Sequence, residues 1–285
     1  MKIIIDNIEF GYTSTPVLRN IELDLGGAQL VSILGPNGVG KSTLIHCINN
    51  ILTPSSGVVT VNGKDITSFK LKELAKIMGY VPYSSSDRFP LTVVDTVLMG
   101  RHPHSNWKST EKDLDVVYDT LELLGIEDLA MRPFNELSAG QHQKVMLARG
   151  FAQEPKVLLL DEPTSNLDIR HQMEVTMLLK EMSVRKGILV IMISHDINIA
   201  SKFSDKMILM SEGTIYSVGT PGEVITEDNI RSVYGVNSKI IDDEGTPHVI
   251  LQNPIGGYRT ESAGSAIEST VLDVRSDSGV PVTGR

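Results

Sequence analysis

The fold is decided by the stretch Gly35-Pro36-Asn37-Gly38-Val39-Gly40-Lys41-Ser42-Thr43. Its spacing of glycine, four residues, glycine, lysine and serine is the pattern of a phosphate-binding loop. An apolar run, Leu30 to Leu34, predicts a buried strand before it, and a helix is expected to begin at Lys41. In this context backbone N–H groups and the helix N-terminus converge on a phosphate. We therefore predict that the whole stretch binds a nucleotide.

Four residues of this loop have expected roles of their own. Gly38 and Gly40 let the backbone approach an anion because they carry no Cβ. Lys41 is expected to be the cation for the β- and γ-phosphates and to take part in catalysis, and the Ser42 hydroxyl to be a ligand of Mg²⁺. The alternative, a glycine-rich turn without a ligand, is disfavoured by the flanking strand and helix.

A second strand, Val157 to Leu160, delivers two carboxylates at its C-terminal end, where ligands bind in open α/β sheets. Asp161 suits Mg²⁺, directly or through water. Glu162 is the candidate general base that accepts a proton from the attacking water. Acidic residues at the end of a strand can also be merely solvated, and the neighbouring phosphate loop argues against that alternative.

Composition places the chain among globular proteins that fold in water. It has 285 residues, of which 41% are hydrophobic and 21% charged. A net charge of −9 argues against a surface that binds nucleic acid or anionic lipid. The apolar runs are too short for a membrane-spanning helix, and the N-terminus lacks the features of a secretory signal. The single cysteine, Cys47, favours a cytosolic compartment and is expected to pack in the core.

Strand and helix signals alternate along the chain, which predicts a parallel α/β sheet. Helical periodicity over about residues 90–152 predicts a helical insertion. The expected strands are Lys2 to Ile5, Val17 to Leu25, Leu30 to Leu34, Val58 to Val61, Met78 to Val81, Val157 to Leu160 and Ile188 to Ile193. From Asn253 glycine, serine and threonine dominate, so residues 253–285 are predicted to be a flexible extension with a short strand around Val271 to Val274.

At this point the sequence resembles the ATP-binding-cassette (ABC) ATPases. Leu137-Ser138-Ala139-Gly140-Gln141 is similar to their signature motif, with alanine where the commonest form has glycine. Ser165-Asn166-Leu167-Asp168 matches their D-loop, His195 their switch histidine, and Tyr12 the aromatic residue that stacks on adenine.

The resemblance covers about residues 1–250. It implies an α/β P-loop NTPase fold over residues 1–252, in which a mixed α/β core carries an N-terminal antiparallel β subdomain and the inserted helical subdomain. It also implies ATP and Mg²⁺ as cofactors and ATP hydrolysis as the reaction.

The signature motif and the switch histidine also have physical interpretations. The Ser138 hydroxyl, nearby N–H groups and the helix dipole can form a second anion site. The resemblance implies that this site faces the γ-phosphate held by the other subunit of a head-to-tail dimer of two ATPase subunits. A plain helix N-cap is the alternative. His195 follows a strand, from where it can contact the γ-phosphate and the attacking water; a structural histidine is its alternative.

Two aromatic or histidine positions have competing interpretations. Tyr12 can pack on its own strand instead of on adenine, and Phe10 can share or replace its role. His102 and His104 suggest a metal pair, but the proline between them and the missing third ligand favour an ordinary loop.

The family pattern breaks at Tyr83. The family usually has a glutamine there, which touches Mg²⁺ and relays contact from the membrane subunit. A neutral phenol is a poor ligand for a hard cation. Mg²⁺ is then held by Ser42 and Asp161 with more water, or with help from one of residues 84–86, all serines. We expect hydrolysis to survive and coupling to the partner to be altered.

Three classes of P-loop protein compete. A kinase or GTPase has no use for the signature motif, and no Asn-Lys-x-Asp guanine motif is visible. A soluble ABC ATPase of the DNA-repair or translation-factor type predicts tandem cassettes or a long coiled coil, and this sequence has one cassette and no sustained heptads. The ATPase subunit of an ABC importer predicts a compact helical insertion with a docking groove.

The stretch Phe89 to Pro103 fits such a docking groove and resembles the importers of iron chelates, cobalamin and haem. The resemblance implies integral membrane permease subunits, an extracytoplasmic substrate-binding protein as an indirect partner, no nucleic acid, and a peripheral location on the cytoplasmic face of the cell membrane. Which of the three chelates is imported stays open. For Met99-Gly100-Arg101 the alternative is an ordinary helix end capped by glycine.

Overall fold

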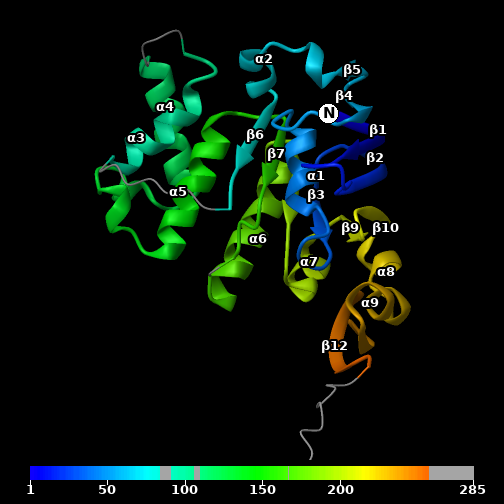
Figure 1. The fold of residues 1–285 in the computed structure, drawn as a ribbon. Coiled ribbons are helices and arrows are strands. Elements are labelled where there is room, and N and C mark those ends of the chain that lie inside the picture. Colours follow the sequence, from blue (N-terminus) through cyan, green and yellow to red (C-terminus); the bar gives the residue numbers. More distant parts are fainter. Residues whose placement is uncertain (84–90, 106–109, 166, 257–285) are drawn as a thin grey trace, which may run out of the picture. The chain divides into compact units, whose positions relative to one another are not determined.

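A six-stranded mixed sheet, with strand order β10-β9-β3-β8-β7-β6, forms the centre of the computed structural model (Figure 1). The structure describes residues 1–83, 91–105, 110–165 and 167–256. β10 pairs antiparallel with β9, and the other neighbours pair in parallel. The bounds are β3 (Gln29–Leu34), β6 (Met78–Val81), β7 (Val157–Leu160), β8 (Leu189–Ile193), β9 (Lys206–Ser211) and β10 (Thr214–Gly219). The predicted mixed α/β core is confirmed.

A second, antiparallel sheet is built from the N-terminal strands, as predicted, in the order β2-β1-β4-β5. Its strands are β1 (Lys2–Phe10), β2 (Leu18–Gly26), β4 (Ser56–Val61) and β5 (Lys64–Asp65). The prediction ended the first strand at Ile5, which is wrong because β1 continues to Phe10. Asn7 has φ +48° and the register shifts between Ile5 and Ile8, so the apolar alternation is interrupted although pairing resumes.

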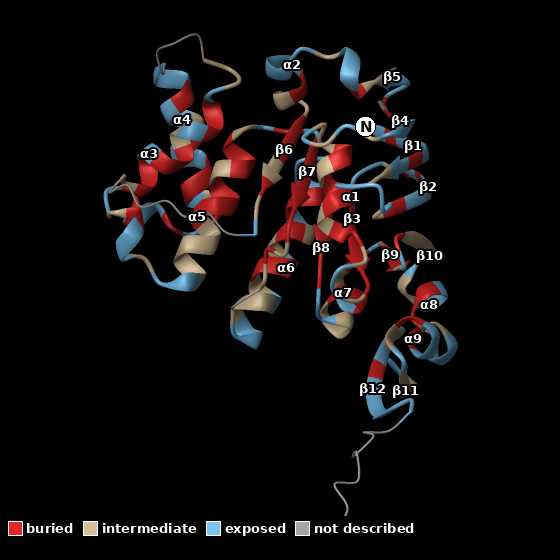
Figure 2. Ribbon diagram, viewed as in Figure 1, coloured by how far each residue is buried: buried red, intermediate tan, exposed pale blue. Residues whose placement is uncertain are grey.

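Helices cover both faces of the central sheet. The side chains of α1 (Lys41–Ile48) pack with Val157 and Leu159 on one face, and those of α6 (Ile169–Arg185) pack with Leu158 on the other. Every residue of β7 and β8 is buried (Figure 2), as expected for parallel strands covered on both sides. The remaining helical elements outside the insertion are η1 (Ile66–Ser68), α2 (Leu71–Ala75), α7 (Ile197–Phe203), α8 (Pro221–Val224) and α9 (Glu227–Tyr234).

Cys47 lies on α1 and is completely buried, which confirms it as a packed core residue. Burial raises the pKa of its thiol to about 11, so the reactive thiolate is disfavoured at neutral pH.

The predicted helical insertion is present and gathers beside β6 (Figure 1). Its elements are α3 (Val93–Leu98), η2 (Met99–Arg101), α4 (Glu111–Leu123), η3 (Glu127–Leu129), η4 (Phe134–Glu136) and α5 (Ala139–Ala152). The buried Arg101 holds three of them together: its Nε donates to Asp113 Oδ1 at 3.0 Å, and its Nη1 donates to Ala152 O at 2.6 Å and to Glu154 Oε2 at 2.7 Å. Phe89 and Pro90 of the expected docking groove lie outside the described residues.

Gly100 does not cap a helix, so that interpretation of Met99-Gly100-Arg101 is wrong. It lies inside η2, between α3 and α5, and a Cβ at this position would lie 2.2 Å from the carbonyl oxygen of Arg149. The residue is needed because two backbones approach closely.

The chain ends its described part in a hairpin of β11 (Val236–Asp243) and β12 (Thr246–Pro254). Asn198 on α7 exchanges two hydrogen bonds with the backbone of Val249, and Ser201 donates to the carbonyl of Pro247. β12 continues past residue 252, the expected end of the ATPase domain. The sequence does not reveal this strand, because most of its side chains are exposed and polar and apolar residues do not alternate regularly. The short strand expected around residues 271–274 lies outside the described residues.

Substituting Gly100→Ala tests the close approach of η2 and α5. We expect the free energy of unfolding to fall by about 1–3 kcal/mol, because overpacking forces the two backbones apart. Gly222→Ala is the matched control, since a Cβ there meets nothing within 4 Å, and it should stay within about 0.5 kcal/mol of the parent. Denaturant unfolding followed by circular dichroism measures both; equal stability of the two variants would contradict the packing role.

Candidate functional site

The phosphate loop joins the end of β3 to α1, which begins at Lys41 as predicted. Gly35 has φ +145°, and a Cβ there would lie 2.4 Å from the carbonyl oxygen of Met210. Gly40 has φ +98°, and its Cβ would lie 2.8 Å from Leu18 Cδ2. Both positions therefore need glycine for conformation and for space. A Cβ at Gly38 would meet open space, so the backbone there is free to receive a ligand.

Lys41 is held by the loop that precedes it. Its Nζ donates to the carbonyl oxygens of Gly35 and Pro36, each at 2.8 Å, and the residue is 6% exposed. Burial lowers the pKa of the ammonium group, while the negative charges of Glu162 and Asp161 oppose that shift. The cation is therefore positioned by hydrogen bonds within the loop itself.

A cavity of about 330 Å³ gathers most of the predicted nucleotide-binding residues. They come from β1's end, the phosphate loop, α1 and the residue pair after β7: Tyr12, Asn37, Gly38, Gly40, Lys41, Ser42, Thr43 and Glu162. Gly35, Pro36 and Val39 do not line it. Val39 packs against the hydrophobic core, and Pro36 and Val39 line a separate cavity of about 600 Å³ at the same loop.

Ser42 and Asp161 meet, as the predicted Mg²⁺ site requires. Ser42 Oγ donates to Asp161 Oδ1 at 3.0 Å. Burial raises the pKa of the Asp161 carboxyl, while the hydrogen bond from Ser42 and the positive charge of Lys41 act in the opposite direction. Hydroxyl and carboxylate oxygens are the ligands that Mg²⁺ prefers, so this pair fits the ion.

Glu162 is held at both carboxylate oxygens. His195 Nε2 lies 2.6 Å from Oε1, and Ser165 Oγ donates to Oε2 at 2.8 Å. Burial acts to raise the pKa of Glu162, but the hydrogen bonds from His195 and Ser165 outweigh it, so the pKa is lowered. Glu162 also has φ +51°, a left-handed conformation that is uncommon for a residue other than glycine and is found at functional sites. The sequence analysis assigns no role to Ser165 of the expected D-loop, because the contact of this residue with Glu162 forms only in the folded turn after β7.

Tyr12 lies beside the phosphate loop with most of its surface exposed. It is 64% exposed, its hydroxyl lies 3.3 Å from Thr43 Oγ1, and its ring meets Phe10 edge-on at 5.0 Å between centroids. The ring therefore contacts its own strand through Phe10, as the alternative interpretation expects, while the hydroxyl lies beside Thr43 of α1. Phe10 supports the exposed ring from the side.

The signature motif forms a separate site. Ser138 is the N-cap of α5 and makes a capping box with Gln141. A cavity of about 270 Å³ lies here, and its polar wall comes from Ser138, Gln141, Lys144 and His171. Gly140 also lines this cavity, whereas Ala139 is exposed and Leu137 packs against the helical core. No residue lines both this cavity and the one at the phosphate loop.

Asp168 of the D-loop caps α6 and orients a histidine that the sequence analysis did not single out. Asp168 Oδ1 accepts from the backbone N–H of His171 at 2.9 Å and lies 2.8 Å from its Nδ1. The backbone hydrogen bond from His171 is the main cause of the lowered pKa of Asp168. A Cβ on Gly140 would lie 3.0 Å from the His171 ring, so the D-loop and the signature motif meet in one chain. Asn166 lies outside the described residues.

The structure describes some of the remaining predicted positions. His104 Nε2 lies 2.9 Å from the carbonyl oxygen of Gln153, which agrees with an ordinary loop. Among the described residues no group of three histidine, cysteine or acidic side chains could hold a metal ion. Tyr83 is 50% exposed, and the serines at 84–86 lie outside the described residues.

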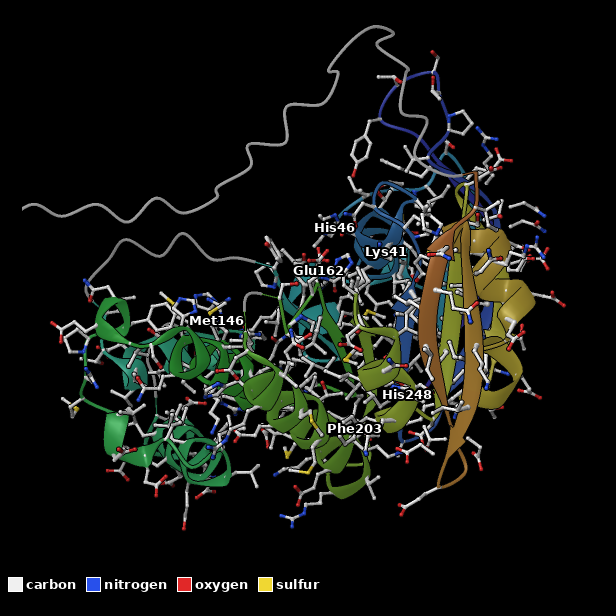
Figure 3. The ribbon with its side chains drawn as sticks, turned by 90° about the horizontal axis from the view of Figure 1, so that it is seen from below. Lys41, His46, Met146, Glu162, Phe203 and His248 are labelled. Atoms are coloured by element: carbon white, nitrogen blue, oxygen red, sulfur yellow. The ribbon has the colours of Figure 1, made fainter. Side chains whose placement is uncertain are left out.

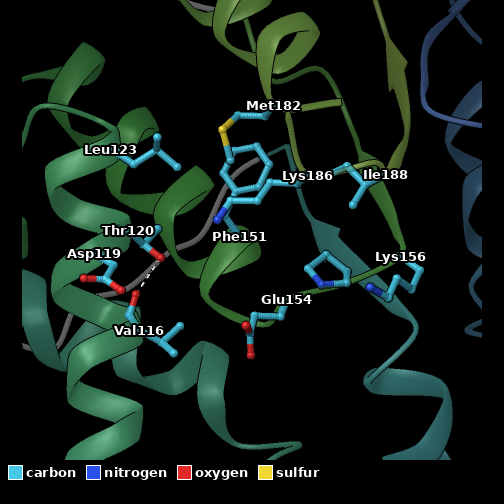
Figure 4. A pocket seen from close by; sticks show the side chains of 11 residues that line it. Val116, Asp119, Thr120, Leu123, Phe151, Glu154, Lys156, Met182, Lys186 and Ile188 are labelled. Carbon is cyan, nitrogen blue, oxygen red and sulfur yellow. Dashed lines mark hydrogen bonds between the residues drawn. The ribbon is translucent and has the colours of Figure 1, made fainter. Parts of the chain in front are cut away.

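A further cavity, of about 190 Å³, lies apart from all predicted site residues (Figure 4). α4, the end of α5 and the end of α6 enclose it, with Phe151 and Met182 as apolar walls. Asp119, Glu154 and two lysines, Lys156 and Lys186, stand at its polar side. It marks the seam between the helical insertion and the central sheet.

A phosphate loop after β3, two carboxylates at the end of β7 and a signature helix with its own cavity together define an ATP-binding-cassette ATPase. The sequence profile described as ABC transporter matches residues 18–165. The chain belongs to this family: it is an ATP-binding, ATP-hydrolysing ABC transporter subunit. In the described part of the chain, every helix is too short or too polar to cross a membrane.

Known proteins similar to the chain confirm the resemblance to importer subunits. An uncharacterized ABC transporter ATP-binding protein of Methanocaldococcus jannaschii is 44% identical over 90% of this chain and 99% of its own length. The ferric enterobactin transport ATP-binding protein of Escherichia coli is 34% identical over 91% of this chain and 96% of its own. A solved inward-facing metal-chelate type ABC transporter has a TM-score of 0.77 at 28% identity, covering 88% of this chain and 96% of that chain.

The hydrogen bond from Ser165 to Glu162 predicts a shift in the pH dependence of hydrolysis. Glu162 is a carboxyl with a lowered pKa, so its ionised form is lost only when the pH falls through that lowered value. Ser165→Ala removes one cause of the lowering, so we expect the acid limb of the ATPase profile to move to higher pH. Ser68→Ala, at an exposed serine that donates to Asp65 O, is the control. Superimposable acid limbs for all three proteins would count against Glu162 as the titrating base.

Proposed function

We propose that this chain powers an importer of metal chelates, in the class of iron–siderophore, cobalamin or haem. The observation that carries this proposal is the similarity, over nearly the whole of both chains, to a ferric enterobactin transport subunit. The similarity to a metal-chelate type transporter of known structure supports the same class. In this proposal an extracytoplasmic binding protein delivers the chelate to membrane permease subunits, and the chain sits on their cytoplasmic face.

The site supports a mechanism in which the residues of one chain bind ATP and prepare a water for attack. The loop N–H groups and Lys41 hold the phosphates. Glu162 accepts a proton from the attacking water, because its lowered pKa keeps it ionised at neutral pH. His195 holds Glu162 in place, and its imidazole can also contact the γ-phosphate of bound ATP. Mg²⁺, on Ser42 and Asp161, would neutralise charge on the phosphate oxygens.

The separate signature cavity supports a head-to-tail dimer. Ser138 and its neighbours present a helix N-terminus, which favours an anion, yet they line a cavity of their own. A second copy can bring its phosphate loop to this cavity. ATP then binds between two chains, each of which contributes one half of the site.

The helical insertion supports docking on a permease. Met99 on η2 is 52% exposed, although Arg101 two residues later is buried and anchored to α4 and α5. An apolar side chain on a rigid base is suited to a protein interface. The net charge of −9 disfavours direct attachment to anionic lipid, so protein contacts are the proposed attachment.

Replacing Glu162 with glutamine tests the dimer. Glu162→Gln removes the base but keeps the size of the side chain, so bound ATP is expected to persist and hold two chains together. Size-exclusion chromatography with light scattering should show a dimer with ATP and a monomer without it. Glu181→Gln, on the exposed side of α6, should hydrolyse ATP like the parent. A Glu162→Gln protein that binds ATP and stays monomeric at saturation would refute the shared site.

Affinity purification from detergent-solubilised native membranes tests the importer assignment. We expect the chain to carry a permease of the metal-chelate class, identified by mass spectrometry. Met99→Asp should abolish this capture, because it places a charge in an apolar interface. Met177→Asp is the matched control, since Met177 on α6 is 55% exposed. Capture of an exporter, or of DNA-repair or ribosomal proteins alone, would overturn the proposal.

A further inference from the structure

His46 and Tyr80 form a hydrogen-bonded pair beside the phosphate loop. His46 Nε2 lies 2.9 Å from Tyr80 Oη, and the two rings meet edge-on with 5.6 Å between centroids. His46 stands on α1 one turn after Ser42, so the two side chains share a helix face. Figure 3 shows His46 close to Lys41 and Glu162.

The register of the sheet brings Tyr80 to the same side as Asp161. Tyr80 on β6 is paired with Leu159 on β7, and both pack in the hydrophobic cluster that contains α1. Alternate side chains along a strand share a face, so Asp161, two residues after Leu159, continues the row that faces α1. Ser42, His46, Tyr80 and Asp161 therefore converge from three elements.

Electrostatic contacts agree with this convergence. Burial, and after it the charge of Asp161, raises the pKa of Tyr80 to about 12, so Tyr80 keeps its proton at neutral pH. A protonated phenol can donate one hydrogen bond and still accept others.

The proposed Mg²⁺ site has too few protein ligands to complete the coordination of the ion, so groups that hold its waters are needed. Mg²⁺ takes six ligands in octahedral geometry and usually keeps several waters. Ser42 and Asp161 provide two protein oxygens, and position 83 holds a tyrosine, whose neutral phenol is a poor ligand for a hard cation. Waters on the ion donate hydrogen bonds, and they are held in place only where an acceptor faces them.

We propose that Tyr80, oriented by His46, positions the water shell of Mg²⁺ on the Asp161 side. The Tyr80 hydroxyl donates to His46 Nε2, which leaves its oxygen free to accept from a metal-bound water. His46 then carries its proton on Nδ1. Tyr80 and His46 are positioning residues, and the assignment rests on the proposed Mg²⁺ site at Ser42 and Asp161.

The test measures how much Mg²⁺ strengthens nucleotide binding. The full chain is titrated with a non-hydrolysable ATP analogue by calorimetry, once in EDTA and once with excess Mg²⁺. Tyr80→Phe removes the hydroxyl and keeps the ring. We expect its affinity in EDTA to equal that of the parent and its gain from Mg²⁺ to be roughly two- to tenfold smaller, the value of one hydrogen bond. His46→Leu, which removes the acceptor that orients Tyr80, should lose the same gain.

Two further variants make the outcome specific. Tyr216→Phe, at a half-exposed tyrosine on β10, is the matched control and should bind like the parent. Tyr83→Gln in the Tyr80→Phe background supplies an amide oxygen, a good Mg²⁺ ligand, and should restore the lost gain. A full Mg²⁺ gain in Tyr80→Phe, an equal loss of affinity with and without Mg²⁺, or no restoration by Tyr83→Gln would each overturn the assignment.

Different results would contradict the proposed nucleotide site. A parent protein that binds no nucleotide in EDTA, or that binds it equally well after Lys41→Ala, would overturn the phosphate loop assignment itself. A parent that binds nucleotide but gains nothing from Mg²⁺ would overturn the metal site, and with it the role of Tyr80 and His46.

Discussion

The burial of the Lys41 ammonium group is the constraint on which the rest of the site depends. A cation out of water is costly unless hydrogen bonds compensate it. The carbonyls of Gly35 and Pro36 provide that compensation, and they reach Nζ only because the loop curls back over the start of α1. That curl requires glycine with positive φ at Gly35 and Gly40 and draws β3, β9 and α1 close together. The conformation that buries the lysine also turns backbone N–H groups toward the space above it.

The parallel sheet supplies the chemistry that the loop lacks. Its strands end at one edge, so residues far apart in sequence meet there: Asp161 and Glu162 after β7, His195 after β8 and Tyr80 near the end of β6. Glu162 shows the consequence. Burial acts to raise its pKa, but hydrogen bonds from His195, after β8, and from Ser165, three residues along its own turn, lower it. The edge thus combines an ionised carboxylate, the pair proposed to hold Mg²⁺ and a cation within one chain.

The helical insertion carries the surfaces that we propose for contact with partner proteins. α5 begins at Ser138, beside the signature cavity, and ends at Ala152, whose carbonyl accepts from Arg101. Arg101 in turn anchors the segment that carries the exposed Met99. One helix therefore joins the surface proposed for a second ATPase subunit to the surface proposed for a permease. A rigid helix transmits a displacement at one end to the other, which is what coupling of ATP binding to transport requires.

The sequence by itself determined the fold class, the central strands and the phosphate loop, because each is encoded locally by apolar runs, glycine spacing and caps. β6, β7 and the start of α1 agree with their predicted residues. The full length of β1, the hairpin β11–β12 and the need for Gly100 were decided by tertiary contacts, since pairing across a bulge, mostly exposed strands and close backbone contacts leave no periodic signal. The contact of His195 with Glu162, the contact of His171 with Gly140 and the pairing of His46 with Tyr80 likewise arise between elements distant in sequence. Residue identity supplies the functional groups, and only the packed sheet and helices determine which of them meet.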